Sequence, residues 1–211
     1  MVDMFVREIK KIVKTLRNIL FTPFVVSDYL EFKERDTNKR FSYSWKTLFP
    51  QIFDKTKLTS FDRHYVYHTA WAARKVKEFN PDKHIDIASS LYFPGILSTF
   101  LPVEFYDYRP APLHLSGLTT QHADLTNLHF SPNSIRSVSC LHTIEHVGLG
   151  RYGDPIDPEG DVKACRELAR VLAPGGRLLF VTPVGKEAII EFNAHRIYTY
   201  EKVLSLFPTL T

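Results

Sequence analysis

Between residues 60 and 185, short apolar runs alternate with longer segments whose apolar residues recur at helical spacing. The segment 60–79 is of the second kind, and Asn80-Pro81 ends it. Short apolar runs, which indicate strands, lie at 84–88, 103–107, 137–141 and 177–182, with helical segments near 89–100 and 161–172 between them. The order strand, helix, strand predicts parallel crossovers, and hence an α/β fold with a doubly wound, mostly parallel sheet.

The pattern shows only one further element after Val184, a helix near 200–207. The run 177–182 would then form an edge strand without an outer partner, and a folded protein must cover or pair such an edge. A homodimer that pairs this edge, or a shortened chain, would each account for the missing strands.

Residues 1–59 form an extension of different character. From 4 to 20, apolar residues share one helical face and basic residues fill the other, so we expect a basic amphipathic helix that Pro23 ends. Lysines interrupt its apolar runs too often for a membrane span or a secretion signal. Such a helix either packs on its own domain or, through residues 1–26, associates with a membrane surface. The α/β domain is expected over residues 60–211.

Charge is divided unevenly along the 211 residues. Residues 1–83 hold 17 Lys and Arg against 10 Asp and Glu, whereas the rest of the chain holds 10 against 13. A membrane surface suits the basic front half better than nucleic acid, because no nucleic-acid-binding motif accompanies the charge. The two cysteines, Cys140 and Cys165, lack the spacing of a metal site, and the cytoplasm is therefore the expected compartment.

Acidic residues stand at the carboxyl ends of the expected strands, where ligands bind in sheets of this kind. Asp86 closes the first strand and opens the stretch DIASSLYFPG. Asp107 closes the second strand, where a carboxylate can accept hydrogen bonds from both ribose hydroxyls. Asp124 would accept from an adenine amine, and the backbone of Leu125 would donate to a ring nitrogen. The set fits adenosine, and the lack of G-x-G-x-x-G argues against a dinucleotide.

Five stretches, DIASS, YDYRP, ADLTNL, CLHTIEHV and LAPGGRLLFVTPVG, resemble successive motifs of class I S-adenosylmethionine-dependent methyltransferases. The resemblance implies a Rossmann-like fold, S-adenosylmethionine as cofactor and methyl transfer as the reaction. Class I folds usually end in an antiparallel strand pair, which this sequence does not show.

Two longer phrases, SCLHTIEHVGLGRYGDPIDPEGDVKA and FNAHRIYTYEKVLSLF, resemble a narrower family of small methyltransferase-like proteins of unknown function, first described from nematodes. Bacterial members of that family are associated with surface-polysaccharide synthesis. The resemblance therefore implies an acceptor hydroxyl on a sugar, a glycan or another small molecule.

The cofactor loop departs from the methyltransferase pattern. Where those enzymes carry glycines beside the methionine part of the cofactor, this chain has Ala88 and Ser90. A side chain at either position would narrow or block the approach of the cofactor. The second hypothesis is therefore an inactive methyltransferase-like protein that acts as a membrane-surface or scaffold module.

His142, Glu145 and His146 form the pattern H-x-x-E-H, which zinc hydrolases use with both histidines on one helix. Here the pattern directly follows a buried strand and no third ligand is evident, so a zinc hydrolase is the least favoured alternative and no resident metal is expected. A second pair, His64 and His68, lies one helical turn apart, and a packed, hydrogen-bonded role is expected for it.

In a methyltransferase the H-x-x-E-H segment, His142 included, would border the transfer site. His146 is the expected general base for the acceptor hydroxyl, since the pKa of histidine lies near neutral pH. Glu145 would orient that imidazole or bind substrate, and Arg151 and Asp154 would contact a polar acceptor. Alternatively, Glu145 and His146 cap the next helix and hold the following loop.

Overall fold

The computed structural model describes residues 23–51 and 54–210. The chain divides into two compact units, residues 1–61 and 62–211, and each is described by itself. This division lies two residues beyond the boundary expected from the sequence. Every residue of the candidate site belongs to the second unit.

The second unit is built on a five-stranded sheet whose strand pairs are all parallel. The strand order is β3-β2-β1-β4-β5. The strands are β1 (His84–Ile87), β2 (Val103–Asp107), β3 (Leu118–His122), β4 (Ile135–Leu141) and β5 (Leu172–Val181). The order reverses between β1 and β4, so the loops after these strands flank a topological switch point. The expected doubly wound fold is confirmed.

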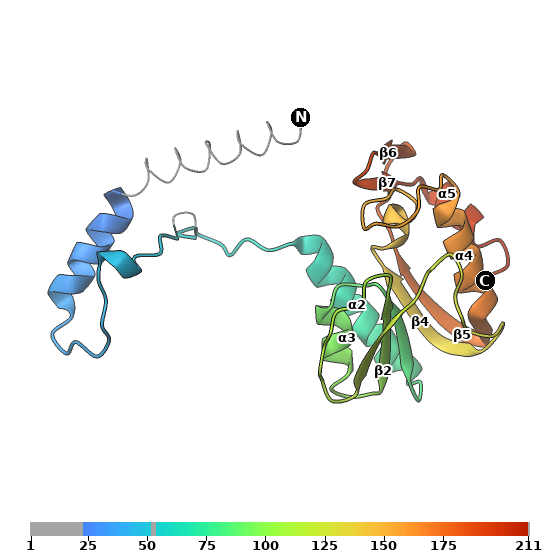
Figure 1. The fold of residues 1–211 in the computed structure, drawn as a ribbon, viewed down its shortest axis with the longest axis horizontal. Coiled ribbons are helices and arrows are strands. Elements are labelled where there is room, and N and C mark those ends of the chain that lie inside the picture. The colour runs from blue at the N-terminus through green and yellow to red at the C-terminus, as the bar shows by residue number, and fades with distance from the viewer. Residues whose placement is uncertain (1–22, 52–53, 211) are drawn as a thin grey trace. The chain divides into compact units, whose positions relative to one another are not determined.

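Helices cover both faces of this sheet (Figure 1). Helices α2 (Arg63–Phe79) and α3 (Tyr92–Leu97) lie on one face, and α4 (Gly160–Val171) and α5 (Tyr200–Leu206) lie on the other. Ala72 and Val76 of α2 pack in one buried cluster with Phe105 of β2. Leu168 of α4 packs in a second cluster with Ile85 of β1. The sheet therefore separates two apolar cores, as side chains that alternate along buried strands require.

Helix α2 follows the predicted pattern closely. The Asp62 carboxylate accepts a hydrogen bond from the Tyr65 amide and so caps the first turn. The buried residues recur every four positions, at His68, Ala72 and Val76. The helix ends at Asn80, which takes the left-handed conformation with φ 51°. Because of this spacing, the buried residues share one face of α2, and that face packs against the sheet.

Three strands of the structure were not predicted from the sequence pattern. The sequence of β3 is LTTQH, and only Leu118 is buried because this strand forms an edge. Strands β6 (Ile189–Glu191) and β7 (His195–Ile197) are three residues long and pair antiparallel in a sheet of their own. The prediction of a single helix after Val184 was therefore wrong. Within the described residues, β5 still forms an outer edge of the large sheet, as expected.

The first unit contains a helix over residues 23–35 and the short 3₁₀ helix η1 (Trp45–Thr47). Pro23 is itself helical, and whether a helix over 4–20 ends before it depends on residues outside the described ranges. The predicted basic helix over 4–20 lies outside the described residues. In the part of the chain that is described, no helix is long and apolar enough to cross a membrane.

A chain of polar side chains crosses the face of β1 and β4 that α3 covers. His84 contacts Ser137 through Nδ1 at 2.7 Å and Ser139 through Nε2 at 2.8 Å. The Ser139 hydroxyl donates in turn to Asp86, which also accepts from Ser89 at 2.6 Å. His84 and Asp86 are fully buried. Burial lowers the pKa of His84 to about 4 and raises that of Asp86 to about 7.

Both cysteines lie in the core on the α4 side of the sheet. Cys140 belongs to β4 and Cys165 to α4, and each is a buried, free thiol. Burial raises the pKa of the Cys140 thiol well above its ordinary value and that of the Cys165 thiol to about 12. Both sulfurs are therefore protonated and serve as small apolar groups.

The first prediction concerns Asp86. Because burial raises its pKa to about 7, the folded state binds a proton between about pH 4 and 7 that the unfolded chain has released. The free energy of unfolding of the wild type should therefore fall, relative to Asp86→Asn, as pH rises through this window, by up to about 1.4 kcal/mol per pH unit. Denaturant titrations at several pH values measure the difference. Asp82→Asn, at an exposed site, is the control, and parallel profiles for wild type and Asp86→Asn would contradict the prediction.

Candidate functional site

A cavity of about 280 Å³ lies at the carboxyl ends of the strands. Its walls come from the loops after β1, β2, β3 and β4 and from the stretch that leads to α4. Ala88, Asp107, Asp124 and Leu125 all line it, as do His142, His146 and Asp154. Most of the residues that the sequence singled out are thus brought together around one cavity.

The two carboxylates of this cavity shape their own loops and still face the ligand space. Asp107 uses Oδ1 to accept from the Arg109 amide at 2.7 Å. Asp124 uses Oδ1 to accept from the amide and the hydroxyl of Thr126, at 2.8 and 2.7 Å. Each side chain keeps a second oxygen for a ligand hydroxyl or amine. The cavity therefore presents carboxylate oxygens that can accept hydrogen bonds from polar groups of a ligand.

Asp86 and Ser90 do not lie where the sequence reasoning put them. Asp86 is buried beneath the cavity, bonded to Ser89 and Ser139, and does not line the cavity wall. A carboxylate at a strand end was expected to face the ligand, but the pleat of β1 turns this one toward α3. Ser90 lines a neighbouring cavity and not the first one.

Ala88 occupies the turn where a methyltransferase carries glycine. Its φ is 56°, in the left-handed region that glycine enters at lower cost. Two backbone contacts hold it there: its amide donates to the Tyr106 carbonyl at 2.7 Å, and its carbonyl accepts from the Thr143 hydroxyl at 2.9 Å. The turn therefore keeps its shape with a methyl group present, and the cavity beside it persists.

A second cavity, of about 560 Å³, adjoins the first. Ala88, His142, His146 and Tyr152 line both cavities, and the second is completed by residues that include Tyr65, Ser90, Glu145, Arg151 and His195. The two spaces thus share one wall. A group bound in the first cavity and a group bound in the second would meet beside the imidazole of His146.

The tautomer of His146 is set by its contact with a carbonyl oxygen. Its Nδ1 lies 2.7 Å from the oxygen of Ala194, which can only accept, so Nδ1 carries the hydrogen and Nε2 carries a lone pair. The Arg151 guanidinium donates to the same carbonyl at 2.9 Å and lies 3.3 Å from Nδ1 of His146; the 2.7 Å contact with the carbonyl is the shorter one and decides where the hydrogen lies. Burial is the largest cause that lowers the pKa of His146 from its ordinary value of 6.5. A neutral imidazole with a free lone pair is the form required of a general base.

Glu145 is 1% exposed, and it orients His142 and not His146. Its Oε1 lies 2.8 Å from Nδ1 of His142 but 4.0 Å from Nε2 of His146. Its Oε2 accepts from the Thr182 hydroxyl at 3.3 Å. The expectation that Glu145 holds the imidazole of His146 is corrected by these distances. The nearest pair in the sequence, Glu145 and His146, point away from each other because a 3₁₀ turn, η2 (Ile144–His146), carries them.

Asp154 holds the loop together and is not free for an acceptor. Its Oδ2 accepts from the amides of Gly148 and Gly150, at 2.7 and 3.4 Å, and its Oδ1 accepts from the Tyr152 amide at 3.2 Å. Both oxygens are thus engaged by the turn GLGRYGD. Asp154 thus stabilises this turn, where a contact with an acceptor was predicted. Arg151 is exposed and lines the second cavity, as its predicted role requires.

The arrangement does not favour a zinc hydrolase. The H-x-x-E-H residues follow β4 through a left-handed His142, with φ 59°, and lie on a 3₁₀ turn instead of a long α-helix. The Nδ1 atom of His146 is engaged by Ala194, and His142 is turned toward α2. The two imidazoles therefore do not converge on one metal position, as the zinc-hydrolase pattern requires.

Sequence reasoning missed several residues of the cavity wall. Tyr108 and Arg109 follow Asp107 directly, and Thr126 follows Leu125. The guanidinium of Arg109 lies 4.8 Å from the ring centroid of Tyr152, so these two residues contact each other in the cavity wall. These residues could have been predicted from their neighbours Asp107 and Leu125, because adjacent residues of a loop often line the same crevice.

Comparisons with known proteins agree with the arrangement of strands and loops. Residues 119–209 match a family described as "Caenorhabditis protein of unknown function, DUF268". The match includes both phrases that resemble the nematode-type family, and it covers less than half of the chain. That part of the resemblance is confirmed. No curated protein matches the sequence.

Several solved structures are similar in fold. The YcgJ protein of Bacillus subtilis is 16% identical with a TM-score of 0.54, over 68% of this chain and 67% of that chain. A Haloferax volcanii methyltransferase complex with its Trm112 activator is 13% identical with a TM-score of 0.45, over 71% and 76%. Phosphoethanolamine N-methyltransferase 2 of Haemonchus contortus is 17% identical with a TM-score of 0.46, over 65% and 36%. The likeness to YcgJ shows a shared fold.

The loop at the cavity rim depends on Gly148, and the second prediction tests this. Gly148 has φ 79°, and a Cβ atom there would overlap the carbonyl oxygen of Asp157. Gly153 in the same loop has φ 85° but nothing within 4 Å of such an atom. Gly153→Ala should cost about 1–2 kcal/mol of unfolding free energy from backbone strain alone. Gly148→Ala should cost at least about 2 kcal/mol more, because backbone atoms must move.

Denaturant unfolding of the two glycine variants, followed by circular dichroism, gives both free energies. Gly153→Ala is the matched control, since it shares the left-handed backbone and lacks the steric overlap. Equal losses in the two variants would show that the approach of the 148 and 157 backbones does not constrain the loop.

Proposed function

We propose that the chain binds S-adenosylmethionine in the first cavity and transfers its methyl group to a hydroxyl of an acceptor in the second. The observation that carries the proposal is the position of His146 in the wall that the two cavities share, with its Nε2 lone pair free. The acceptor class that we favour is a sugar, a glycan or another small molecule with hydroxyl groups.

The residues of the first cavity fit the nucleoside part of this cofactor. Asp107, at the end of β2, would accept hydrogen bonds from the ribose hydroxyls. Asp124 would accept from the adenine amine, and the Leu125 backbone would meet the ring edge. Ala88 lines the same cavity and does not fill it. S-adenosylmethionine would supply an electrophilic methyl group on a positively charged sulfur.

His146 supplies the base for the acceptor. As the acceptor oxygen forms its bond to the methyl carbon, Nε2 takes the hydroxyl proton, and the bond from that carbon to sulfur breaks. Nδ1 keeps its hydrogen throughout, because the Ala194 carbonyl accepts it at 2.7 Å. The products are the methyl ether, an imidazolium and a neutral thioether. A pKa below 6.5 keeps the imidazole neutral and ready at pH 7.

The second cavity is suited to a polar acceptor. Tyr65, Ser90 and Arg151 line it and offer hydroxyl and guanidinium groups for hydrogen bonds with acceptor oxygens. The ring of Tyr152 lies 4.8 and 5.1 Å from the guanidinium groups of Arg109 and Arg151 and so holds two hydrogen-bond donors beside the cavities. This composition favours a sugar-like acceptor over an apolar one.

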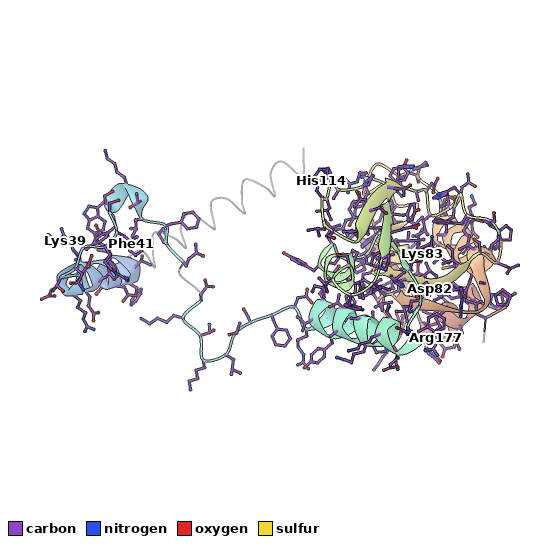
Figure 2. The ribbon with its side chains drawn as sticks, turned by 90° about the horizontal axis from the view of Figure 1, so that it is seen from below. Lys39, Phe41, Asp82, Lys83, His114 and Arg177 are labelled. Carbon is purple, nitrogen blue, oxygen red and sulfur yellow. The ribbon has the colours of Figure 1, made fainter. Side chains whose placement is uncertain are left out.

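The third prediction concerns cofactor binding. Isothermal titration calorimetry should show that S-adenosylmethionine and S-adenosylhomocysteine bind the wild type, and that Asp107→Ala weakens both by roughly 10-fold or more through loss of a charged hydrogen-bond acceptor. Asp82→Ala is the control, because Asp82 is an exposed residue just before β1 (Figure 2). If folded wild-type protein takes up neither ligand, the proposed function is wrong.

The fourth prediction separates binding from chemistry at His146. His146→Asn keeps an N–H that can donate to Ala194 and removes the Nε2 lone pair. Binding of S-adenosylhomocysteine should stay within about twofold of wild type, while transfer of a labelled methyl group to a panel of sugars and glycans should fall about 10²–10⁴-fold. The wild-type rate should rise with pH with a midpoint below 6.5, because burial lowers the pKa of His146 from that value. Equal wild-type and variant rates would rule out this base.

A further inference from the structure

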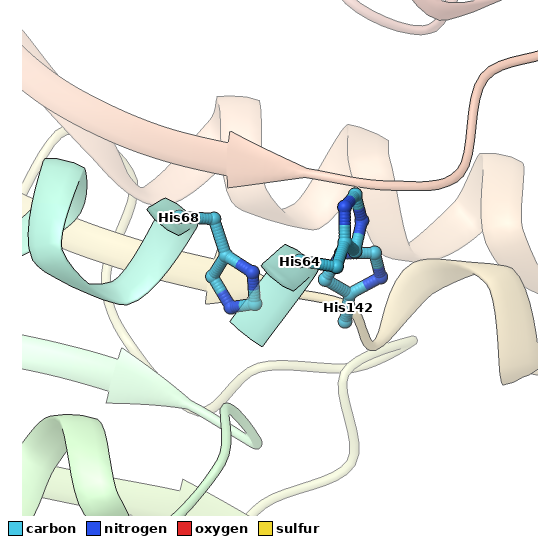
Figure 3. A group of neighbouring side chains, drawn as sticks. All are labelled: His64, His68 and His142. Atoms are coloured by element: carbon cyan, nitrogen blue, oxygen red, sulfur yellow. The ribbon is translucent and has the colours of Figure 1, made fainter. Parts of the chain in front are cut away.

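Three histidines from two distant parts of the chain gather at the start of α2. His64 and His68 lie one helical turn apart on α2, and His142 follows β4. Each offers one ring nitrogen, and these three nitrogens all lie within 4.8 Å of one another. Figure 3 shows the three side chains grouped between the first turns of α2 and the loop after β4. The ring centroids of His64 and His142 are 4.3 Å apart.

The buried nitrogens of this cluster are without partners in the described part of the protein. Nδ1 and Nε2 of His68 and Nε2 of His142 are buried and make no hydrogen bond there. His68 is 8% exposed, and the side chain of His142 is 7% exposed. Buried ring nitrogens are normally paired, because a buried unpaired nitrogen has lost the hydrogen bonds that it makes with water. His68 is therefore packed, as expected, with a polar contact to the His64 backbone, and its ring nitrogens can serve as ligands.

The Nδ1 atom of His142 has the kind of partner that metal-binding histidines have. Its Nδ1 donates to the buried carboxylate of Glu145 at 2.8 Å, so its Nε2 carries the lone pair and points to the other two histidines. A carboxylate that orients a ligating imidazole in this way raises its basicity and fixes its tautomer. Glu145 thus prepares His142 to bind a cation.

We propose that His64, His68 and His142 form a site for one divalent transition-metal ion of the zinc class. Imidazole nitrogens suit zinc, copper, nickel and iron, and three such ligands leave one position of a tetrahedral ion for water. The proposal is independent of methyl transfer. It departs from the expectation of no metal, because the sequence places His142 far from the pair on α2.

The site needs only small movements to close around an ion. Nitrogens that share a tetrahedral zinc ion lie about 3.3 Å apart, as Zn–N bonds of about 2.0–2.1 Å require. His64 is exposed in the first turn of α2, and rotation of its side chain can shorten the present separations. Access is direct, because a cleft of about 470 Å³ lined by Arg63, His64, Tyr67, His68 and Trp71 is open to solvent. The ion would link α2 to the loop that carries Glu145 and His146.

The fifth prediction tests the site with zinc itself. Tag-free full-length protein, stripped with a chelator and dialysed, should bind one Zn²⁺ per chain in calorimetry. Its melting temperature should rise by roughly 5 °C when zinc stands about 100-fold above its Kd. Co²⁺ should give the absorption spectrum of a tetrahedral site. None of these measurements requires S-adenosylmethionine or an acceptor, so their failure is distinct from failure of the proposed function.

Single substitutions define the ligands. His64→Ala, His68→Ala and His142→Ala should each weaken zinc binding at least about 10-fold, and Glu145→Gln should weaken it about 10–100-fold through the orientation of His142. His64 is exposed, so its removal leaves the buried core in place and keeps the test valid if a buried variant unfolds. His114→Ala is the matched control, since His114 is exposed and lies far from α2 (Figure 2). A wild type without stoichiometric zinc, or a His64→Ala variant that binds zinc as the wild type does, overturns the proposal.

Discussion

The hydrogen bond between His142 and the buried Glu145 carboxylate is the contact on which the candidate site depends. A carboxylate that is 1% exposed cannot stay without donors, because burying an unpaired charge costs several kcal/mol. Nδ1 of His142 and the Thr182 hydroxyl provide those donors. The bond also decides which way each histidine of the H-x-x-E-H segment faces. His142 turns toward α2, and His146 is left to the Ala194 carbonyl and the cavities.

The segment between β6 and β7 completes the site from the far end of the chain. The Ala194 carbonyl fixes His146, and the next residues hold the loop that leads to α4. Arg196 donates to the Val147 carbonyl, and Tyr198 donates to Asp161 at 2.9 Å. Ordinary hydrogen bonds to short elements thus determine the tautomer of the proposed base. The described C-terminal residues thus form part of the wall of the candidate site, although β6 and β7 belong to a sheet of their own.

The sequence predicted the parallel core well and the finer geometry poorly. Strands such as β1 and β4 are buried on both faces, so their apolar runs are visible in the sequence, whereas the edge strand β3 has four partly or fully exposed residues. The strand-end residues Asp107 and Asp124 were found because chain order alone brings them to one crevice. The prediction that Asp86 faces the cavity was wrong because the direction of a side chain near the end of a strand depends on the pleat. The grouping of His142 with His64 and His68 depends on how α2 packs, which no local pattern reveals.

The two buried thiols have a consequence for how this fold can be followed in solution. Cys140 and Cys165 lie at the centre of the core between the sheet and α4, and their raised pKa values keep them as unreactive thiols while that core is closed. The rate at which a thiol reagent modifies these cysteines therefore reports how often the core of the domain opens. Since one sulfur belongs to β4 and the other to α4, the order in which they react reports whether helix and sheet separate before the strands do. The chain thus contains its own pair of probes for local unfolding at the layer that supports the site.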